Sequence, residues 1–263
     1  MAASTRRTTS SSRTWARCDA GEPGSATRLA IRFRRVSSIE ISEAGGVRQL
    51  HFGSELVQGA MRIARPWALE LEYTREMMLP LLLHPGPAWP RTVLQVGLGA
   101  ASFTRFLHRH RPRARVTVVE LSPDVVAAAR QFFKLPEESS RLAIEIADGH
   151  DWLAATDRRF DLVLVDGFDA EGRAGMLESL PFYLNARSRL NAGGMLATNL
   201  LTRSRSVAPV ARRLREAFEG RVAVLPPCGA GNTVAIAARD GELRLDPGKL
   251  REPARRLKEE AGL

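Results

Sequence analysis

The sequence predicts an α/β fold built on a doubly wound, mostly parallel β-sheet. From Thr92 onward, short apolar runs alternate with segments in which apolar residues recur at helical spacing. Two late runs, 222–225 and 233–237, follow each other without a helix between them, which predicts antiparallel pairing at an edge of the sheet. We therefore expect a sheet covered by helices on both faces, with ligands at the carboxyl ends of the parallel strands.

The expected elements of this domain follow one another in regular order. Seven strands are expected, at 92–96, 115–119, 142–146, 161–165, 194–200, 222–225 and 233–237. Helices are expected at 100–109, 123–133, 149–155, 181–190 and 207–219. Parallel strands need a crossover between them, and these helices supply it.

The rest of the chain differs from this domain in composition and periodicity. The N-terminal stretch is rich in Ser, Thr and Arg with little apolar content, which is typical of disorder. Alternation with a period of two then predicts short antiparallel strands, and Pro66 is expected to open a helix from Trp67 to Leu83. We expect a disordered tail (1–26), a small N-terminal β-sheet domain (27–65), a linking helix with a Pro-rich linker (66–90), the α/β domain (91–240) and a charged C-terminal extension (241–263).

Charge and composition argue against several kinds of protein. The net charge is +10, but residues 1–35 carry eight arginines and only two acids, so a nucleic-acid surface on the domain is not indicated. No apolar run reaches the roughly 18 residues of a membrane span. Cys18 and Cys228 form no C-x-x-C motif and the histidines show no metal-ligand spacing. We expect a reduced, cytoplasmic protein without a metal.

A glycine-containing turn follows the first strand of the α/β domain. Gly97 and Gly99 interrupt the apolar run before helical spacing resumes, which brings backbone N–H groups and the positive end of a helix close to a ligand. The alternative is a tight turn without a ligand. Glu120 ends the second strand, 21 residues after Gly99. An acid there is placed to accept hydrogen bonds from ribose hydroxyls, although it could instead cap the next helix.

Acidic residues also follow the third and fourth strands. Asp148 and Gly149 come after the third, where a carboxylate can accept from an exocyclic amine or can cap a helix. Asp166 and Asp169 follow the fourth strand in the order Asp-Gly-Phe-Asp. They could bind a cationic amine, or one could act as a base, and crowding would raise at least one pKa. For Asp169 the alternative is turn formation.

Together these residues resemble the spermidine synthase (polyamine aminopropyltransferase) family, which has the class I S-adenosylmethionine-dependent methyltransferase fold, a Rossmann-like fold. The resemblance covers roughly residues 46–240. Its motifs are the segment Arg48-Gln-Leu-His-Phe-Gly53 of the preceding sheet with Gln58, the segment Tyr73-Thr-Arg-Glu-Met-Met78, the glycine turn, Val119-Glu120, Asp148-Gly149, Asp166-x-x-Asp169, Pro181-Phe-Tyr183 and Gly193-Gly194.

The resemblance implies a nucleoside-type donor in the α/β domain. The donor would be S-adenosylmethionine or its decarboxylated form, with 5'-methylthioadenosine as the product. By resemblance, Gly97 and Gly99 lie at the methionine portion, Glu120 binds the ribose, and Asp148 with Gly149 binds the adenine.

The resemblance also implies the residues that act on the acceptor, a small amine or another small molecule. Asp166 would be the catalytic base that deprotonates the attacking amine. Asp169, Gln58 and Tyr73 would lie near the amine substrate. A homodimer is also implied.

The chain departs from the family pattern at the glycine turn. Family members carry Gly-Gly-Gly-Asp-Gly-Gly, whose aspartate holds the ammonium group of the decarboxylated donor, and Ala100 stands at that position here. Asp166-Gly-Phe-Asp-Ala170 also lacks the family's proline. Tyr73 stands one residue further from the Glu-Met that follows it than is usual in the family. Three hypotheses therefore stay open: aminopropyl transfer, methyl transfer on the same fold, and adenosyl-ligand binding without catalysis. We expect ordinary S-adenosylmethionine to bind at least as well as the decarboxylated form.

Overall fold

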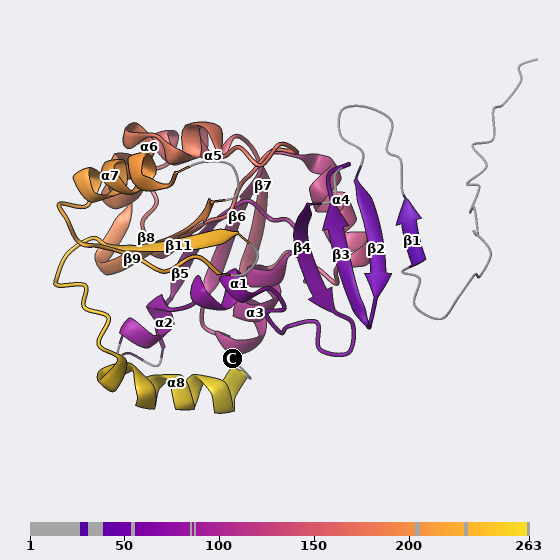
Figure 1. Cartoon of the computed structure of the whole chain (residues 1–263), viewed down its shortest axis with the longest axis horizontal. Helices are drawn as coiled ribbons and strands as arrows, with labels where there is room; N and C mark the ends of the chain where they lie inside the picture. The colour runs from indigo at the N-terminus through magenta and orange to yellow at the C-terminus, as the bar shows by residue number, and fades with distance from the viewer. Residues whose placement is uncertain are drawn as a thin grey trace, which may run out of the picture.

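A large α/β domain and a small antiparallel sheet lie side by side in the computed structural model (Figure 1). The structure describes residues 27–30, 39–53, 56–84, 86, 88–202, 206–228 and 231–261. The disordered tail expected over 1–26 lies outside the described residues. Among the helices in the described segments, none combines the length and the apolar character needed to cross a membrane.

Seven strands form the large sheet, in the order β10-β11-β9-β8-β5-β6-β7. The central strand β5 (Thr92–Val96) pairs in parallel with β6 and β8, which in turn pair in parallel with β7 and β9. The bounds are β6 (Arg115–Glu120), β7 (Leu142–Ile146), β8 (Phe160–Val165) and β9 (Leu190–Leu201). The predicted mostly parallel sheet is confirmed.

The antiparallel pairing expected at one edge of the sheet is also confirmed. Strand β11 (Asn232–Ala238) runs against both β9 and the edge strand β10 (Val222–Val224). All seven residues of β11 are buried, so this strand belongs to the core. Its register places Val234 opposite Asn199 of β9.

Helices cover both faces of the large sheet because strand residues point alternately to the two sides. On β5, Val93 packs in one buried cluster, whereas Leu94 and Val96 pack in another. The first cluster holds side chains of α3 (Ser102–His110), α4 (Pro123–Phe132) and α8 (Pro247–Ala261). The second holds those of α5 (Gly149–Ala155), α6 (Leu180–Ser188) and α7 (Ala208–Ala217), which Figure 1 shows together on one side of the sheet.

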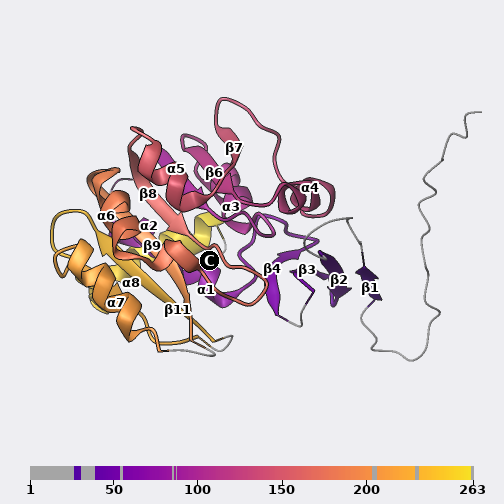
Figure 2. The same ribbon diagram turned by 90° about the horizontal axis from the view of Figure 1, so that it is seen from above.

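The small sheet has the order β1-β2-β3-β4, and each neighbouring pair is antiparallel. The strands are β1 (Thr27–Ala30), β2 (Glu40–Ala44), β3 (Val47–His51) and β4 (Val57–Arg62). Strand β4 lies nearest the α/β domain and β1 farthest from it (Figures 1 and 2). Leu50 and Met61 share a buried cluster with Phe106 of α3, so the two sheets are joined by one core.

The single helix expected from Trp67 to Leu83 is wrong. The structure has two short helices, α1 (Glu72–Glu76) and α2 (Pro80–Leu83), joined by a turn. In that turn Met78 and Leu79 donate to carbonyls only three residues back, and Pro80 has no N–H to continue an α-helical ladder. The apolar spacing is present, but the proline divides the element.

The small sheet and the glycine turn after β5 meet at a contact between two small residues. A Cβ placed on Gly59 of β4 would lie 2.6 Å from Ala100 Cβ and 2.8 Å from Ala100 N. Ala100 is accordingly only 2% exposed. Strand β4 can therefore approach the turn closely only because position 59 has no side chain.

Gly59→Ala is expected to lower the stability of the protein by about 1–3 kcal/mol, the usual cost of overpacking. The measurement is denaturant unfolding of the full chain. Gly248→Ala is the control, because its new methyl group would meet only the carboxylate oxygen of Asp246, at 3.2 Å. Equal stability of the two variants would show that the contact between Gly59 and Ala100 relaxes at no cost.

Candidate active site

Parallel pairing brings the residues predicted from four motifs together at the carboxyl ends of the parallel strands. Val96, the last residue of β5, pairs with Val119 and with Val165. Gly97, Glu120 and Asp166 therefore lie at adjacent strand ends. Glu120 pairs in turn with Ile146, the last residue of β7, two residues before Asp148. The sequence correctly placed these residues together.

The two glycines of the turn allow backbone segments to approach one another. A Cβ on Gly97 (φ +89°) would lie 2.1 Å from the carbonyl oxygen of Asp166. A Cβ on Gly99 (φ +50°) would lie 3.3 Å from the carbonyl oxygen of Gln58 on β4. The sequence left open a turn close to a ligand and a tight turn without one. The contacts that require glycine at these two positions are with the protein's own backbone.

Glu120 is 8% exposed and supports the glycine turn. One carboxylate oxygen accepts from the backbone N–H of Leu98 at 2.7 Å, and the other accepts from that of Ser122 at 2.9 Å. Burial raises the pKa of Glu120, and these backbone hydrogen bonds offset part of the rise. The carboxylate of Glu120 is thus held by backbone N–H groups of the glycine turn and of the segment after β6.

Asp148 caps the helix that follows β7. Its Oδ1 accepts from the N–H groups of His150 and Asp151, at 2.8 and 3.2 Å. The capping alternative is thus present, and the residue is exposed at the edge of the site. Gly149 is required locally, because a Cβ there would lie 2.4 Å from Val96 Cγ1.

Asp148, His150 and Asp151 also place one donor atom each within 4.8 Å of one another, a spacing that could hold a cation. Within this group His150 Nδ1 and Asp151 Oδ1 already form a pair at 3.0 Å, and both aspartates are exposed. Exposed acidic groups of this kind are common without an ion. The expectation that no metal is used stays a prediction.

Asp166 lies at the centre of a chain of hydrogen bonds. Tyr73 Oη of α1 donates to Oδ2 at 3.1 Å, and Asn199 Nδ2 of β9 donates to Oδ1 at 2.9 Å. Asn232 Nδ2 of β11 donates in turn to Asn199 Oδ1 at 3.0 Å. Burial raises the pKa of Asp166, and the bonds from Asn199 and Tyr73 offset part of the rise. Burial and the adjacent Asp166 also raise the pKa of Tyr73 well above its usual value.

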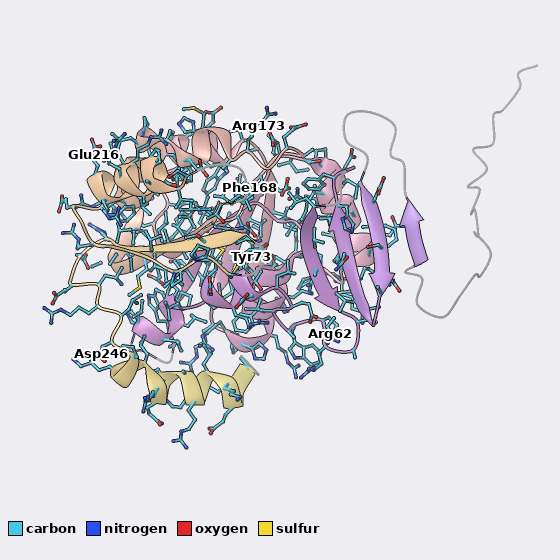
Figure 3. All side chains as sticks on the ribbon, in the orientation of Figure 1. Arg62, Tyr73, Phe168, Arg173, Glu216 and Asp246 are labelled. Carbon is cyan, nitrogen blue, oxygen red and sulfur yellow. The ribbon has the colours of Figure 1, made fainter. Side chains whose placement is uncertain are left out.

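Asp169 is not a second carboxylate of this centre. Its Oδ1 accepts from the N–H groups of Glu171 and Arg173, and its Oδ2 accepts from Arg173 Nε at 2.8 Å. Burial tends to raise the pKa of Asp169, but the hydrogen bonds from Arg173 outweigh it and the pKa is lowered. The expectation that crowding of the two aspartates raises a pKa is wrong, since burial is the cause for Asp166. Figure 3 shows Tyr73 in the interior and Arg173 at the surface.

Gln58 of β4 lies beside the glycine turn, as the carbonyl contact with Gly99 shows. Its side-chain Nε2 is buried and has no hydrogen-bond partner among the described residues. A buried amide without a partner is costly, and it marks a position where a ligand acceptor would be favourable. The predicted residues Gln58, from the small sheet, and Tyr73, from α1, therefore both approach the carboxyl ends of the parallel strands.

Sequence reasoning missed two kinds of residue near the carboxyl ends of the parallel strands. Asn199 is a polar residue inside the apolar strand expected at 194–200, and this was the signal that could have found it. Asn232 lies directly before the strand expected at 233–237 and carries no such signal. Leu121 and Ile146 are large apolar residues that are 68% and 56% exposed, directly after Glu120 and opposite it in the sheet. Met176 of η1 (Gly175–Glu178), in the segment after Asp169, is exposed as well. An exposed apolar rim beside polar acceptors is typical of a ligand site.

A cavity of about 460 Å³ lies elsewhere in the molecule. It is bounded by the turn at Arg65 to Ala68, the end of α3 and the end of α8. None of the predicted site residues lines it, so the cavity does not coincide with the candidate active site.

The order of the strands and the antiparallel edge define the fold class, which is that of the class I methyltransferases. Human methyltransferase-like protein 13, solved in complex with SAH, superposes with a TM-score of 0.65 at 24% identity, over 73% of this chain and 93% of its own. A probable spermidine synthase from Corynebacterium glutamicum superposes with a TM-score of 0.72 at 20% identity, over 88% and 87%.

Sequence comparison identifies the family within that class. Residues 70–225 match the spermine/spermidine synthase domain. A polyamine aminopropyltransferase from Neisseria meningitidis is 36% identical over 225 residues, which cover 86% of this chain and 85% of the relative. The protein of that name from Chromobacterium violaceum is 37% identical over 236 residues, covering 90% and 89%. The chain belongs to the spermine/spermidine synthase family, and the resemblance inferred from the sequence is confirmed.

Asp166→Asn is expected to raise the melting temperature at about pH 8 and to lose that gain toward about pH 4. Because the pKa of Asp166 is raised, the folded protein holds a proton that the unfolded chain releases above the usual aspartate pKa of 3.8. Wild-type stability therefore falls as pH rises from 3.8 through the raised pKa. Each 1 kcal/mol corresponds to about 2–4 °C for a protein of this size. Thermal unfolding across this pH range measures the difference.

Asp169→Asn is the comparison variant for this measurement. Since the pKa of Asp169 is lowered, its contribution is present above 3.8 and is lost as pH falls through the lowered value. Asp169→Asn should therefore lose a little stability at neutral pH. If both variants shift in the same direction with pH, the burial assigned to Asp166 is incorrect.

Proposed function

We propose that the protein transfers an aminopropyl group from decarboxylated S-adenosylmethionine to a small amine. The observation that carries the proposal is the Asp166 carboxylate, at the end of β8 between Tyr73 and Asn199, with a pKa raised by burial. A carboxylate of raised pKa is suited to accept a proton from an ammonium group. The relatives named polyamine aminopropyltransferases support this reaction over the alternatives.

The donor would bind along the ends of β5, β6 and β7. Glu120 would accept from the ribose hydroxyls and Asp148 from the adenine amine, with Gly149 beside it and Gly97 and Gly99 at the methionine portion. The residues present fit such a ligand, because a buried acceptor lies next to exposed apolar side chains that a purine would cover. Methylthioadenosine would be the product.

The amine would bind between β4, α1 and the end of β8. We assign Tyr73 and Gln58 to this side, the latter because its buried Nε2 has no partner among the described residues. The amine nitrogen forms a bond to the aminopropyl carbon, and the bond from that carbon to sulfur breaks with its electron pair left on sulfur. The proton of the amine goes to Asp166. Asp169 would act at the rim of the site, where Arg173 neutralises it.

The donor preference and the assembly belong to the same proposal. Ala100 is buried against Gly59, so no side chain from that position reaches an ammonium group of the donor. We therefore keep the expectation that ordinary S-adenosylmethionine binds at least as well as the decarboxylated form. A homodimer, a cytoplasmic location and catalysis without a metal complete the proposal.

The direct test is incubation of purified protein with decarboxylated S-adenosylmethionine and a series of diamines, with mass-spectrometric detection of the aminopropylated product. Asp166→Asn is expected to lower kcat by about a hundred- to ten-thousand-fold, the range for loss of a general base. Affinity for methylthioadenosine should persist in that variant, measured by calorimetry. Methylated product from ordinary S-adenosylmethionine would favour methyl transfer, and no product from either donor would favour ligand binding alone.

Glu120→Ala is expected to weaken methylthioadenosine by about 1.5–3 kcal/mol, the contribution of hydrogen bonds to a charged group. Calorimetry on folded protein measures the change. Glu145→Ala is the control: Glu145 lies on the neighbouring strand β7, and its carboxylate binds Trp152 and Arg158 instead. Unchanged affinity in Glu120→Ala would remove Glu120 from the donor site.

A further inference from the structure

Two asparagine side chains, Asn199 and Asn232, extend the hydrogen-bond chain of Asp166 into the core, and the proposed reaction assigns them no role. Asn199 is 4% exposed and Asn232 is 6% exposed, and they come from adjacent antiparallel strands. Asn232 Nδ2 donates to Asn199 Oδ1, and Asn199 Nδ2 donates to Asp166 Oδ1. Buried amides of this kind are stable only when donor faces acceptor at every step.

The direction of this hydrogen-bond chain is fixed by chemistry. The carboxylate of Asp166 can only accept while ionised, so Asn199 must turn its NH₂ group toward it. That orientation leaves Asn199 Oδ1 facing away, where it needs a donor, and Asn232 provides one. Without Asn232 the amide of Asn199 would keep a buried oxygen without a partner, and the reversed orientation would compete.

The two oxygens of Asp166 therefore differ. A proton on Oδ1 would face the N–H of Asn199, which has no lone pair to accept it. A proton on Oδ2 would face Tyr73 Oη, which lies 3.1 Å away and can accept as well as donate. The same carboxylate thus has one oxygen held as an acceptor and one oxygen free to be protonated.

We propose that Asn199 and Asn232 are positioning residues, a relay of two amides that holds Asp166 Oδ1 as an acceptor and directs the proton of the amine to Oδ2. This inference rests on the proposed role of Asp166 as the base. It gives Asn232 a part in catalysis although Asn232 makes its contact with Asn199.

The charged groups around Asp166 do not replace this relay. Tyr73 faces it from α1, and Cys228, in the loop before β11, lies near Tyr73. Asp169 and Arg173 pair with each other in the segment after β8. Hydrogen bonds from Asn199 and Tyr73 are the two interactions that lower the pKa of Asp166 against burial.

The chain offers a matched control between β9 and β8. Asn191 Nδ2 of β9 donates at 2.7 Å to Asp161 Oδ1 of β8, at the opposite end from the pair of Asn199 and Asp166. Asn191→Leu removes the same kind of hydrogen bond far from the active site. A purely structural loss should affect both ends of the strands alike.

The experiment measures the pKa of Asp166 in the full chain by ¹³C NMR of its carboxyl carbon, identified by its absence from Asp166→Asn. Asn199→Leu is expected to raise this pKa by about one to two units, the effect of removing a hydrogen bond to the charged form. Asn232→Leu should raise it by about half a unit. The acidic limb of the kcat/KM profile should shift upward by the same amounts, and Asn191→Leu should leave both readouts unchanged.

A further readout separates a relay from two independent effects. If Asn232 acts through Asn199, the double variant should have the pKa of Asn199→Leu alone. Additive shifts, or no shift in a folded Asn232→Leu protein, would overturn the relay. Should Asn199→Leu not fold, Asn199→Ala removes the same donor without adding another, and it takes the place of Asn199→Leu in the double variant. The NMR readout needs no turnover, so failure of the proposed aminopropyl transfer is distinguishable from failure of the relay.

Discussion

Among the glycines of the described segments, Gly97 makes the closest approach to another part of the backbone, where the turn after β5 meets the end of β8. A Cβ on Gly97 would lie 2.1 Å from the carbonyl oxygen of Asp166, so this contact exists only with glycine at a positive φ. The approach sets the position of Asp166 and of the Leu98 N–H group, which donates a hydrogen bond to Glu120. The acids at the ends of β6 and β8 are thus placed by one backbone contact between their neighbours.

Burial of these acids has an energetic consequence. Neither Glu120 nor Asp166 has a cationic partner among the hydrogen bonds and ion pairs described, and neutral donors hold both carboxylates. The raised pKa values of the two groups express the cost of desolvation that these donors only partly offset. Functional sites commonly retain such a cost because a less buried carboxylate would be a weaker base.

The alternation of strands and helices, the antiparallel edge and the acids at strand ends could be predicted from periodicity, because each depends on residues close in sequence. Periodicity could not predict the division of 67–83 into two helices, since the apolar spacing continues across Pro80. Asp169 appeared to belong with Asp166, but its bond to Arg173 is a local turn that spacing alone does not distinguish from a site. Asn199 and Asn232 meet only through strand register.

Arg105 explains how three distant segments come together at the glycine turn. Its buried guanidinium donates to the carbonyl oxygens of Pro66, Ala100 and Phe133. Burial lowers its pKa to about 9, so the group stays charged at neutral pH. On one side Arg105 holds the Ala100 carbonyl, and on the other Gly59 packs against the Ala100 methyl group. Ala100 is therefore used here to join the two sheets. Under the proposed function, a donor would rely on the acids at the neighbouring strand ends.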